Sequence, residues 1–186
     1  AEIDADPSAG WGKPVRQGPS HPDALRETAD FLNSLKRPLL LLGMQASAPC
    51  LSESLQLYVK QSGLPYCSTF QGPGRWVAPE QYVGRLGLFR NQPADTLLSA
   101  ADGVICIGFD PVEYDPSIWN SDRQRQIVNV DVQPADQDRA FLPRVELIGD
   151  LHQTLIAMAT LPAVTVSTYF LQLQRACAAE LQATTA

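Results

Sequence analysis

The sequence has few basic residues and little histidine. It holds 14 lysines and arginines against 20 aspartates and glutamates, a formal net charge of −6 at pH 7, and only His21 and His152. A nucleic-acid partner requires a basic face that replaces the counterions of the phosphate backbone. A zinc site usually draws on several histidines or closely spaced cysteines. We therefore expect neither nucleic-acid binding nor a metal site in this chain.

Closely spaced cysteines and long apolar runs are missing too. Cys50, Cys67, Cys106 and Cys177 form no CxxC pair, which argues against a metal or redox centre. The longest apolar run, Leu39 to Leu42, is far shorter than the roughly 20 residues of a membrane-spanning helix, and no signal peptide is visible. These features predict a cytoplasmic protein with reduced thiols and no membrane partner.

Three familiar ligand or catalytic motifs are absent as well. Only Gly43 follows the first predicted strand, so the GxGxxG fingerprint of dinucleotide-binding domains is missing. The sequence has no P-loop lysine and no GxSxG nucleophile elbow, and its Ser, His and Asp residues show no triad spacing. We expect this chain to carry no complete set of catalytic groups.

What the sequence does contain is the pattern of an α/β domain. Apolar residues make up 45% of 186 residues, enough for one sizeable core. Short apolar runs typical of buried strands alternate with segments of helical periodicity, which favours a mainly parallel sheet. Strands are expected at 39–43, 65–70, near 82–84, at 104–108, 127–132 and 145–148. The predicted fold is a Rossmann-like three-layer α/β/α domain with about six strands.

The chain divides into three parts. Residues 1–19, rich in glycine and proline, are expected to be a linker in which Trp11 docks on a domain. Residues 20–162 form the predicted central domain, whose first helix is expected to be capped by Ser20 and whose helix after residue 150 is expected to be capped by Asp150. Residues 163–186 are predicted to be an amphipathic linker helix.

Ligands of open parallel sheets bind beyond the carboxyl ends of the strands. Four residues are expected there and are candidates for a vestigial nucleotide cleft: Gly43, Gly108, Asp131 and Asp150. The competing interpretation is that glycines and aspartates end strands and cap helices in any such fold, and without further evidence it is favoured. A nearby acidic group, which includes Glu113, is expected to lie on a solvated loop.

Several segments resemble one known family. RLGLFRNQ at 85–92, ADGVICIG at 101–108 and PVEYDPSIWN at 111–120 are similar to the central domain of acetolactate synthase, and more narrowly to its catabolic, FAD-independent branch. PLLLLGMQAS at 38–47 and VELIGD at 145–150 resemble it in the same order. The resemblance covers about residues 20–161 and implies a scaffold domain that is inactive alone.

The resemblance also implies a larger parent enzyme. The parent would have three domains and would join two pyruvates to 2-acetolactate with loss of CO2. Its two other domains, which hold thiamine diphosphate and Mg2+, would be the partners of this chain, in a homo-oligomer. This chain would hold no cofactor. FAD binding is doubtful because segment 109–114 lacks the arginines of flavin-dependent relatives, and Leu88-Phe89-Arg90 replaces their Met-His-Gly.

The same resemblance implies that some side chains shape the mouth of a site built by the other domains. These substrate-channel candidates are Phe89, Asn91, Gln92, Glu113 and Tyr114. Three alternatives remain open: a stand-alone module for FAD or another adenine nucleotide, an interaction domain without a small ligand, and a thiol enzyme that uses Cys67 or Cys106.

Overall fold

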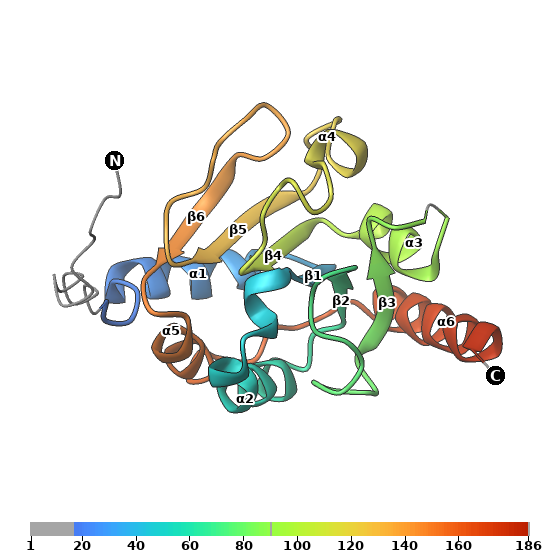
Figure 1. Ribbon diagram of the computed structural model, residues 1–186, viewed down its shortest axis with the longest axis horizontal. Helices are drawn as coiled ribbons and strands as arrows, with labels where there is room; N and C mark the ends of the chain where they lie inside the picture. Colours follow the sequence, from blue (N-terminus) through green and yellow to red (C-terminus); the bar gives the residue numbers. More distant parts are fainter. Residues whose placement is uncertain (1–16, 90, 186) are drawn as a thin grey trace, which may run out of the picture.

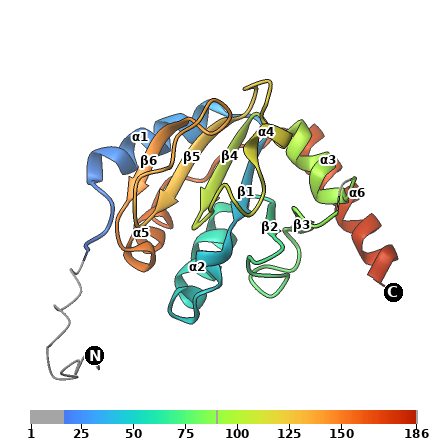
Figure 2. The ribbon, with the colours of Figure 1, turned by 45° about the horizontal axis from the view of Figure 1, so that its top comes forward.

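The computed structural model describes residues 17–89 and 91–185 and shows a sheet between layers of helices (Figures 1 and 2). The sheet has six strands in the order β3-β2-β1-β4-β5-β6, and all the pairings between them are parallel. The strands are β1 (Pro38–Leu42), β2 (Tyr66–Thr69), β3 (Tyr82–Leu86), β4 (Gly103–Ile107), β5 (Gln126–Asp131) and β6 (Pro143–Ile148). The predicted Rossmann-like α/β fold is confirmed.

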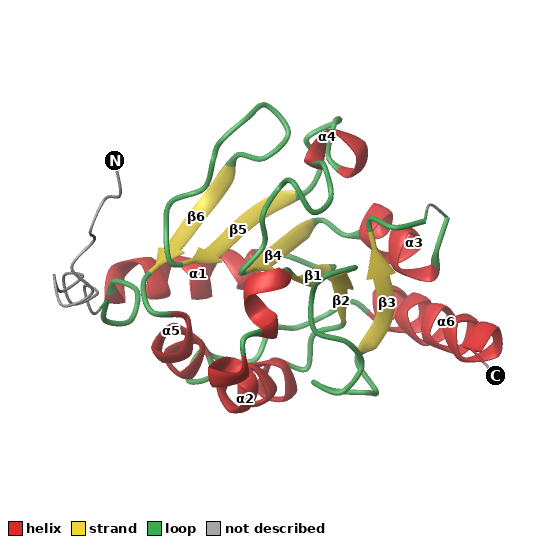
Figure 3. Ribbon diagram, viewed as in Figure 1, coloured by secondary structure: helices red, strands yellow, loops and turns green. Residues whose placement is uncertain are grey.

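The helices cover both faces of the sheet. They are α1 (Pro22–Ser34), α2 (Ser52–Ser62), α3 (Pro93–Ala100), α4 (Pro116–Trp119), α5 (Leu151–Met158) and α6 (Thr168–Thr185), with 3-10 turns η1 (Met44–Ser47) and η2 (Pro49–Leu51). α2 packs beside α5, and α3 packs beside α6 (Figure 1). The connections from β2 to β3 and from β5 to β6 are loops without helices (Figure 3).

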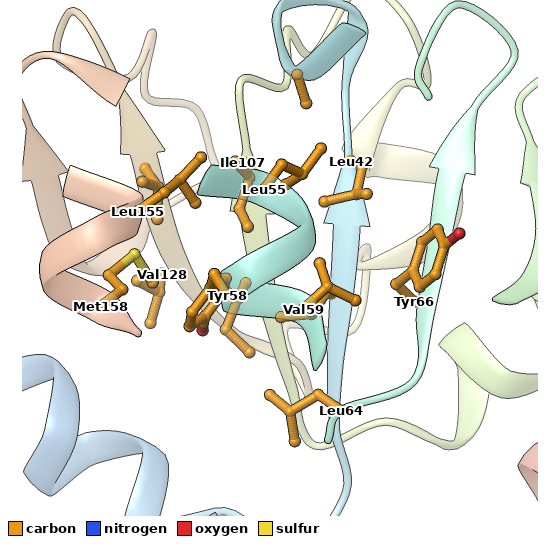
Figure 4. Close-up of a cluster of buried hydrophobic side chains, with 14 of the residues drawn as sticks. Leu42, Leu55, Tyr58, Val59, Leu64, Tyr66, Ile107, Val128, Leu155 and Met158 are labelled. Atoms are coloured by element: carbon orange, nitrogen blue, oxygen red, sulfur yellow. The ribbon is translucent and has the colours of Figure 1, made fainter. Parts of the chain in front are cut away.

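The run of leucines in β1 is buried on both faces. Leu40 and Leu42 join the apolar cluster under α2 and α5, whereas Leu39 and Leu41 join the cluster under α3 and α6. This alternation follows from the two-residue period of a strand. In Figure 4, Leu55 of α2 lies against Leu42 and Ile107 of the neighbouring strands. β1 can have no polar face, which explains its unbroken apolar sequence.

The cap of the first helix differs from the expected one. Ser20 does not cap α1; the cap is His21, whose side chain accepts from the Asp23 amide. Ser20 is buried instead, and its hydroxyl and amide contact the Thr154 hydroxyl of α5. The expectation failed because a partner far along the sequence competes for this side chain.

Helix α6 belongs to the packed core. It contacts α3 and β3, and Phe170 and Cys177 are buried against them. At the other end, the Gly18 carbonyl accepts from the Asp150 amide, so residues from 17 onward already lie on the domain. Trp11 lies outside the described residues. The division of the chain at residues 19 and 162 stays a prediction.

Two buried tyrosines, Tyr58 in α2 and Tyr66 in β2, differ in the hydrogen bonding of their hydroxyl groups. The Tyr58 hydroxyl has no hydrogen-bond partner among the described residues, and burial raises the pKa of this phenol. The Tyr66 hydroxyl donates to the Gly74 carbonyl at 3.0 Å and accepts from the Ala78 amide at 3.3 Å. An unpaired buried polar group costs stability, whereas a paired one adds to it.

We expect Tyr58→Phe to raise the free energy of unfolding by about 1 kcal/mol, because it removes a desolvated and unpaired hydroxyl. Tyr66→Phe makes the same chemical change and should lower it by about 1–2 kcal/mol. Urea unfolding followed by circular dichroism measures both. Equal losses in the two variants would show that the Tyr58 hydroxyl has a partner after all.

The cysteines differ sharply in exposure. Cys67 in β2 and Cys106 in β4 are fully buried, and burial raises the pKa of both thiols. Cys177 is buried in α6, whereas Cys50 in η2 is exposed. Thiolates react with labelling reagents, and neutral buried thiols do not. The exposed cysteine should therefore be modified much faster than the three buried ones.

We expect a maleimide to modify Cys50 within minutes in the native protein at pH 7.5. Cys67, Cys106 and Cys177 should react only after unfolding in urea. Peptide mass spectrometry identifies the labelled residue, and Cys50→Ser should abolish the fast phase. Fast stoichiometric labelling of Cys67 or Cys106 in the native protein would instead support the thiol-enzyme alternative.

Candidate functional site at the carboxyl ends of the strands

The four predicted cleft residues gather at one edge of the sheet. Gly43 follows β1, Gly108 follows β4, Asp131 ends β5, and Asp150 lies just beyond β6. Backbone bonds join neighbours along this edge, from the Gly43 amide to the Ile107 carbonyl and from the Gly108 amide to the Val130 carbonyl. Backbone hydrogen bonds therefore extend the pairing of neighbouring strands to the residues that follow them. Whether these residues bind a nucleotide stays a prediction.

The loops after β1 and β4 touch each other at two glycines. A Cβ atom on Gly43 would lie 2.3 Å from the Gly108 carbonyl oxygen and from the Phe109 Cα. Gly108 has a φ of 55°, and a Cβ there would lie 2.8 Å from that of Gln45. No other residue fits at either place without moving the backbone. Here the glycines permit contact between two loops of the protein.

The side chain of Glu113 lies at the carboxyl ends of the strands. It is only 8% exposed. Its carboxylate accepts from the amide of Met44 at 2.9 and 3.1 Å and from the amide of Asp110 at 3.0 Å. The Thr69 hydroxyl donates to it as well. Glu113 thereby ties together the ends of β1, β2 and β4, and the expectation that it lies on a solvated loop is wrong.

A second carboxylate, Asp131, faces the same loop from β5. It accepts from the Gln45 side-chain amide at 3.1 Å and from the amides of Val132 and Gln133 at 2.6 and 3.3 Å. Burial raises the pKa of Asp131 above its ordinary value, and these hydrogen bonds oppose the rise. The residue anchors the loop after its own strand and holds Gln45 in place.

Gln45 lines two separate cavities. One, of about 260 Å3, lies between the loops after β4 and β5 and is bordered by Phe109 and Asp131. The other, of about 680 Å3, lies towards the start of α5 and is bordered by Asp150 and His152. Asp150 caps α5 by accepting from the Gln153 amide at 2.9 Å. Its capping role is confirmed.

The other substrate-channel candidates lie around the start of α3. Gln92 is the N-cap of this helix, and its amide donates to the Asp95 carboxylate at 2.9 Å. The hydroxyl of Tyr114 donates to the same carboxylate at 3.0 Å. Asn91 and Tyr114 border a common cavity of about 130 Å3. These three residues therefore form one group around Asp95.

Phe89 faces outwards and shares the lining of a cavity with Gln92 of that group. It is 69% exposed and borders a cavity of about 550 Å3 at the β3 edge. The carboxylate of Glu113 is hydrogen-bonded to the ends of β1, β2 and β4 instead. Their assignment to a substrate channel stays a prediction.

Sequence reasoning missed the partners of Glu113. Thr69, Met44 and Gln45 carry the hydrogen bonds that organise this edge. Thr69 ends β2, whereas Met44 and Gln45 lie in η1 after β1. All three are far from Glu113 and Asp131 in the sequence, so no local spacing joins them. Among the described residues, no three His, Cys, Asp or Glu side chains come together as a metal site. Those residues also contain no helix with the length and apolarity needed to cross a membrane.

Comparisons with known proteins identify relatives of this domain. Acetolactate synthase of Bacillus subtilis (strain 168) is 41% identical over 140 residues, which are 74% of this chain and 25% of that protein. Catabolic acetolactate synthase of Raoultella terrigena is 37% identical over 161 residues, which are 82% of this chain and 28% of that protein. The chain thus spans about a quarter of each relative, and the predicted resemblance is confirmed.

The fold has solved counterparts. A thiamin diphosphate-dependent enzyme from Mycobacterium smegmatis superposes with a TM-score of 0.64 at 19% identity, covering 88% of this chain and 32% of that one. The family model described as the central domain of thiamine pyrophosphate enzymes matches residues 25–158. Because this match includes most of the chain and all six strands, the chain belongs to the family of thiamine pyrophosphate enzyme central domains.

Proposed function

We propose that this chain is the central, structural domain of a catabolic-type acetolactate synthase. The observation that carries the proposal is the 41% identity to an acetolactate synthase of which the chain spans 25%. The parent would condense two pyruvates to 2-acetolactate and release CO2. Thiamine diphosphate and Mg2+ would be held by its two other domains, in a cytoplasmic homo-oligomer.

The contacts of this domain support a scaffold role. Glu113, Asp131 and Asp150 each accept backbone N–H groups of the domain itself. Such hydrogen bonds fix loops, and a carboxylate so engaged is poorly placed to exchange protons with a substrate. What the domain offers a neighbour is therefore shape and surface.

One apolar surface is available for that purpose. We call it the β3-edge surface; it is formed by Leu88 and Phe89, which are 63% and 69% exposed. Both border the cavity of about 550 Å3, which Leu181 of α6 also lines. Exposed aromatic and aliphatic groups around a hollow mark interaction sites. We propose that another domain of the parent covers this surface.

The neighbouring domain would be the one that follows α6 in the parent. The C-terminal end of α6 lies beyond β3 at the right of Figure 1, on the side of this surface. A short connection would suffice to bring the next domain onto it. Phe89 and Gln92 would then border the junction between the two domains, in agreement with their predicted place at the mouth of the active site.

The first test compares the parent reading frame with this chain. With pyruvate, thiamine diphosphate and Mg2+, the full-length protein should form 2-acetolactate, detected as acetoin after acid decarboxylation. This chain should form none, and thiamine diphosphate with Mg2+ should not shift its melting temperature. Acetolactate formation by the chain alone, or its absence from the cofactor-loaded parent, would refute the proposal.

A second test probes the β3-edge surface in the parent. Leu88→Ala should lower the melting temperature of the parent and reduce its specific activity several-fold. The reason is that burial of a leucine at a domain junction contributes about 1.5–3 kcal/mol. Ile156→Ala in α5 is the matched control, since Ile156 is 42% exposed and lies away from this surface. Equal effects of the two substitutions would show that Leu88 is not covered in the parent.

A further inference from the structure

The amides that follow β1 are all engaged within the protein. Those of Gly43, Gln45 and Ala46 donate to the carbonyls of Ile107, Gly108 and Gly43, at 3.0, 3.1 and 3.2 Å. The Met44 amide donates to the Glu113 carboxylate at 2.9 Å. A ligand therefore finds no unused N–H in this loop.

In a sheet of this strand order, that loop is where a dinucleotide's phosphates bind. The order reverses between β1 and β4, and ligands occupy the crevice at such a point. Phosphates are held there by backbone N–H groups of the loops, because the groups converge and carry partial positive charge. The Met44 and Asp110 amides, one from each loop, converge on a single carboxylate of Glu113. The protein thus already contains an anion at this position.

The surroundings of Glu113 match those of a bound anion. The two amides and the Thr69 hydroxyl are three donors, and among the described residues no Lys, Arg or His pairs with the carboxylate. The residue is 8% exposed, so solvent provides little hydration. A negative charge held in this way depends on the loop amides.

We propose that Glu113 is an internal anion that fills the phosphate position and excludes diphosphate-bearing nucleotides from this domain. A phosphate competing for the same amides would have to displace the carboxylate or lie beside it. Two negative charges about 4 Å apart near a protein surface repel strongly enough to weaken binding roughly a thousandfold. The inference concerns the cleft alone and holds whatever reaction the parent catalyses.

Two separate cavities lie beside the loop after β1 that Glu113 holds in place. Glu113 holds the loops after β1 and β4 together beside the contact of Gly43 with Gly108. The flanking cavities of about 260 and 680 Å3 both touch Gln45, which lies between them. A nucleotide that reached from one cavity to the other would have to pass Gln45.

The test removes the internal anion and supplies an external one. Glu113→Ala should bind inorganic phosphate and ADP at least tenfold more tightly than the unaltered chain, measured by isothermal titration and by melting temperature at constant ionic strength. Glu113→Gln keeps the side-chain volume and loses the charge, so it relieves the repulsion but still occupies the loop amides. Its gain in phosphate affinity should therefore be smaller than that of Glu113→Ala. Phosphate should stabilise the Ala variant, and equal concentrations of chloride should not.

The control is Glu146→Ala. Glu146 accepts the Ala135 amide at 2.7 Å but lies on β6, away from the reversal point, so its loss should not create phosphate affinity. If Glu113→Ala unfolds in chloride buffer, recovery of its circular dichroism in phosphate is the readout. If Glu113→Ala shows no higher affinity for phosphate, Glu113 does not occupy the phosphate position. If the variant binds phosphate more tightly but not ADP, Glu113 does not exclude nucleotides.

Discussion

The pairing of β1 with β4 is the contact on which the domain depends. On the β1 side of this pair lie β2 and β3, and on the β4 side lie β5 and β6. The register runs from Pro38 against Gly103 to Leu42 against Ile107, so both strands end level with each other. This forces their loops to meet, and small residues are required where they do. The glycines after these strands follow from that geometry.

Carboxylates fasten the loops around this pair. Glu113 joins the ends of β1, β2 and β4, and Asp131 joins the end of β5 to the same loop. At the opposite end of the sheet, Asp102 accepts the amides of Lys36 and Arg37, just before β1. These acids satisfy backbone groups that strands and helices leave unpaired. Part of the acidic excess of the sequence thus has a structural use.

The sequence predicted features that depend on local pattern. The unbroken leucines of β1 and the apolar run of β4 predicted buried strands, and the Asp150 cap was recognised from its place before a helix. The strand at Tyr82–Leu86 could be expected only approximately, because its apolar residues are few and it follows a long loop. Local pattern therefore defined the fold and most element positions.

The organisation of the site could not be predicted in the same way. Glu113 and Met44 are 69 positions apart in the sequence, and the motif around Glu113 reads equally well as a polar surface loop. Ser20 shows the same limit, because its buried contact with Thr154 overrides the role that its local sequence favours. Side chains that contact distant loops are fixed by tertiary structure, and no spacing rule reveals them.

The position of α6 has a consequence for biosynthesis. This helix, Thr168–Thr185, closes the apolar face of α3 and β3, which lie far earlier in the chain. A ribosome adds residues one at a time from the amino end, so α3 and β3 emerge well before Phe170 and Cys177 can cover them. During synthesis the apolar side chains of α3 and β3 that α6 covers therefore stay exposed until residues 168–185 have emerged.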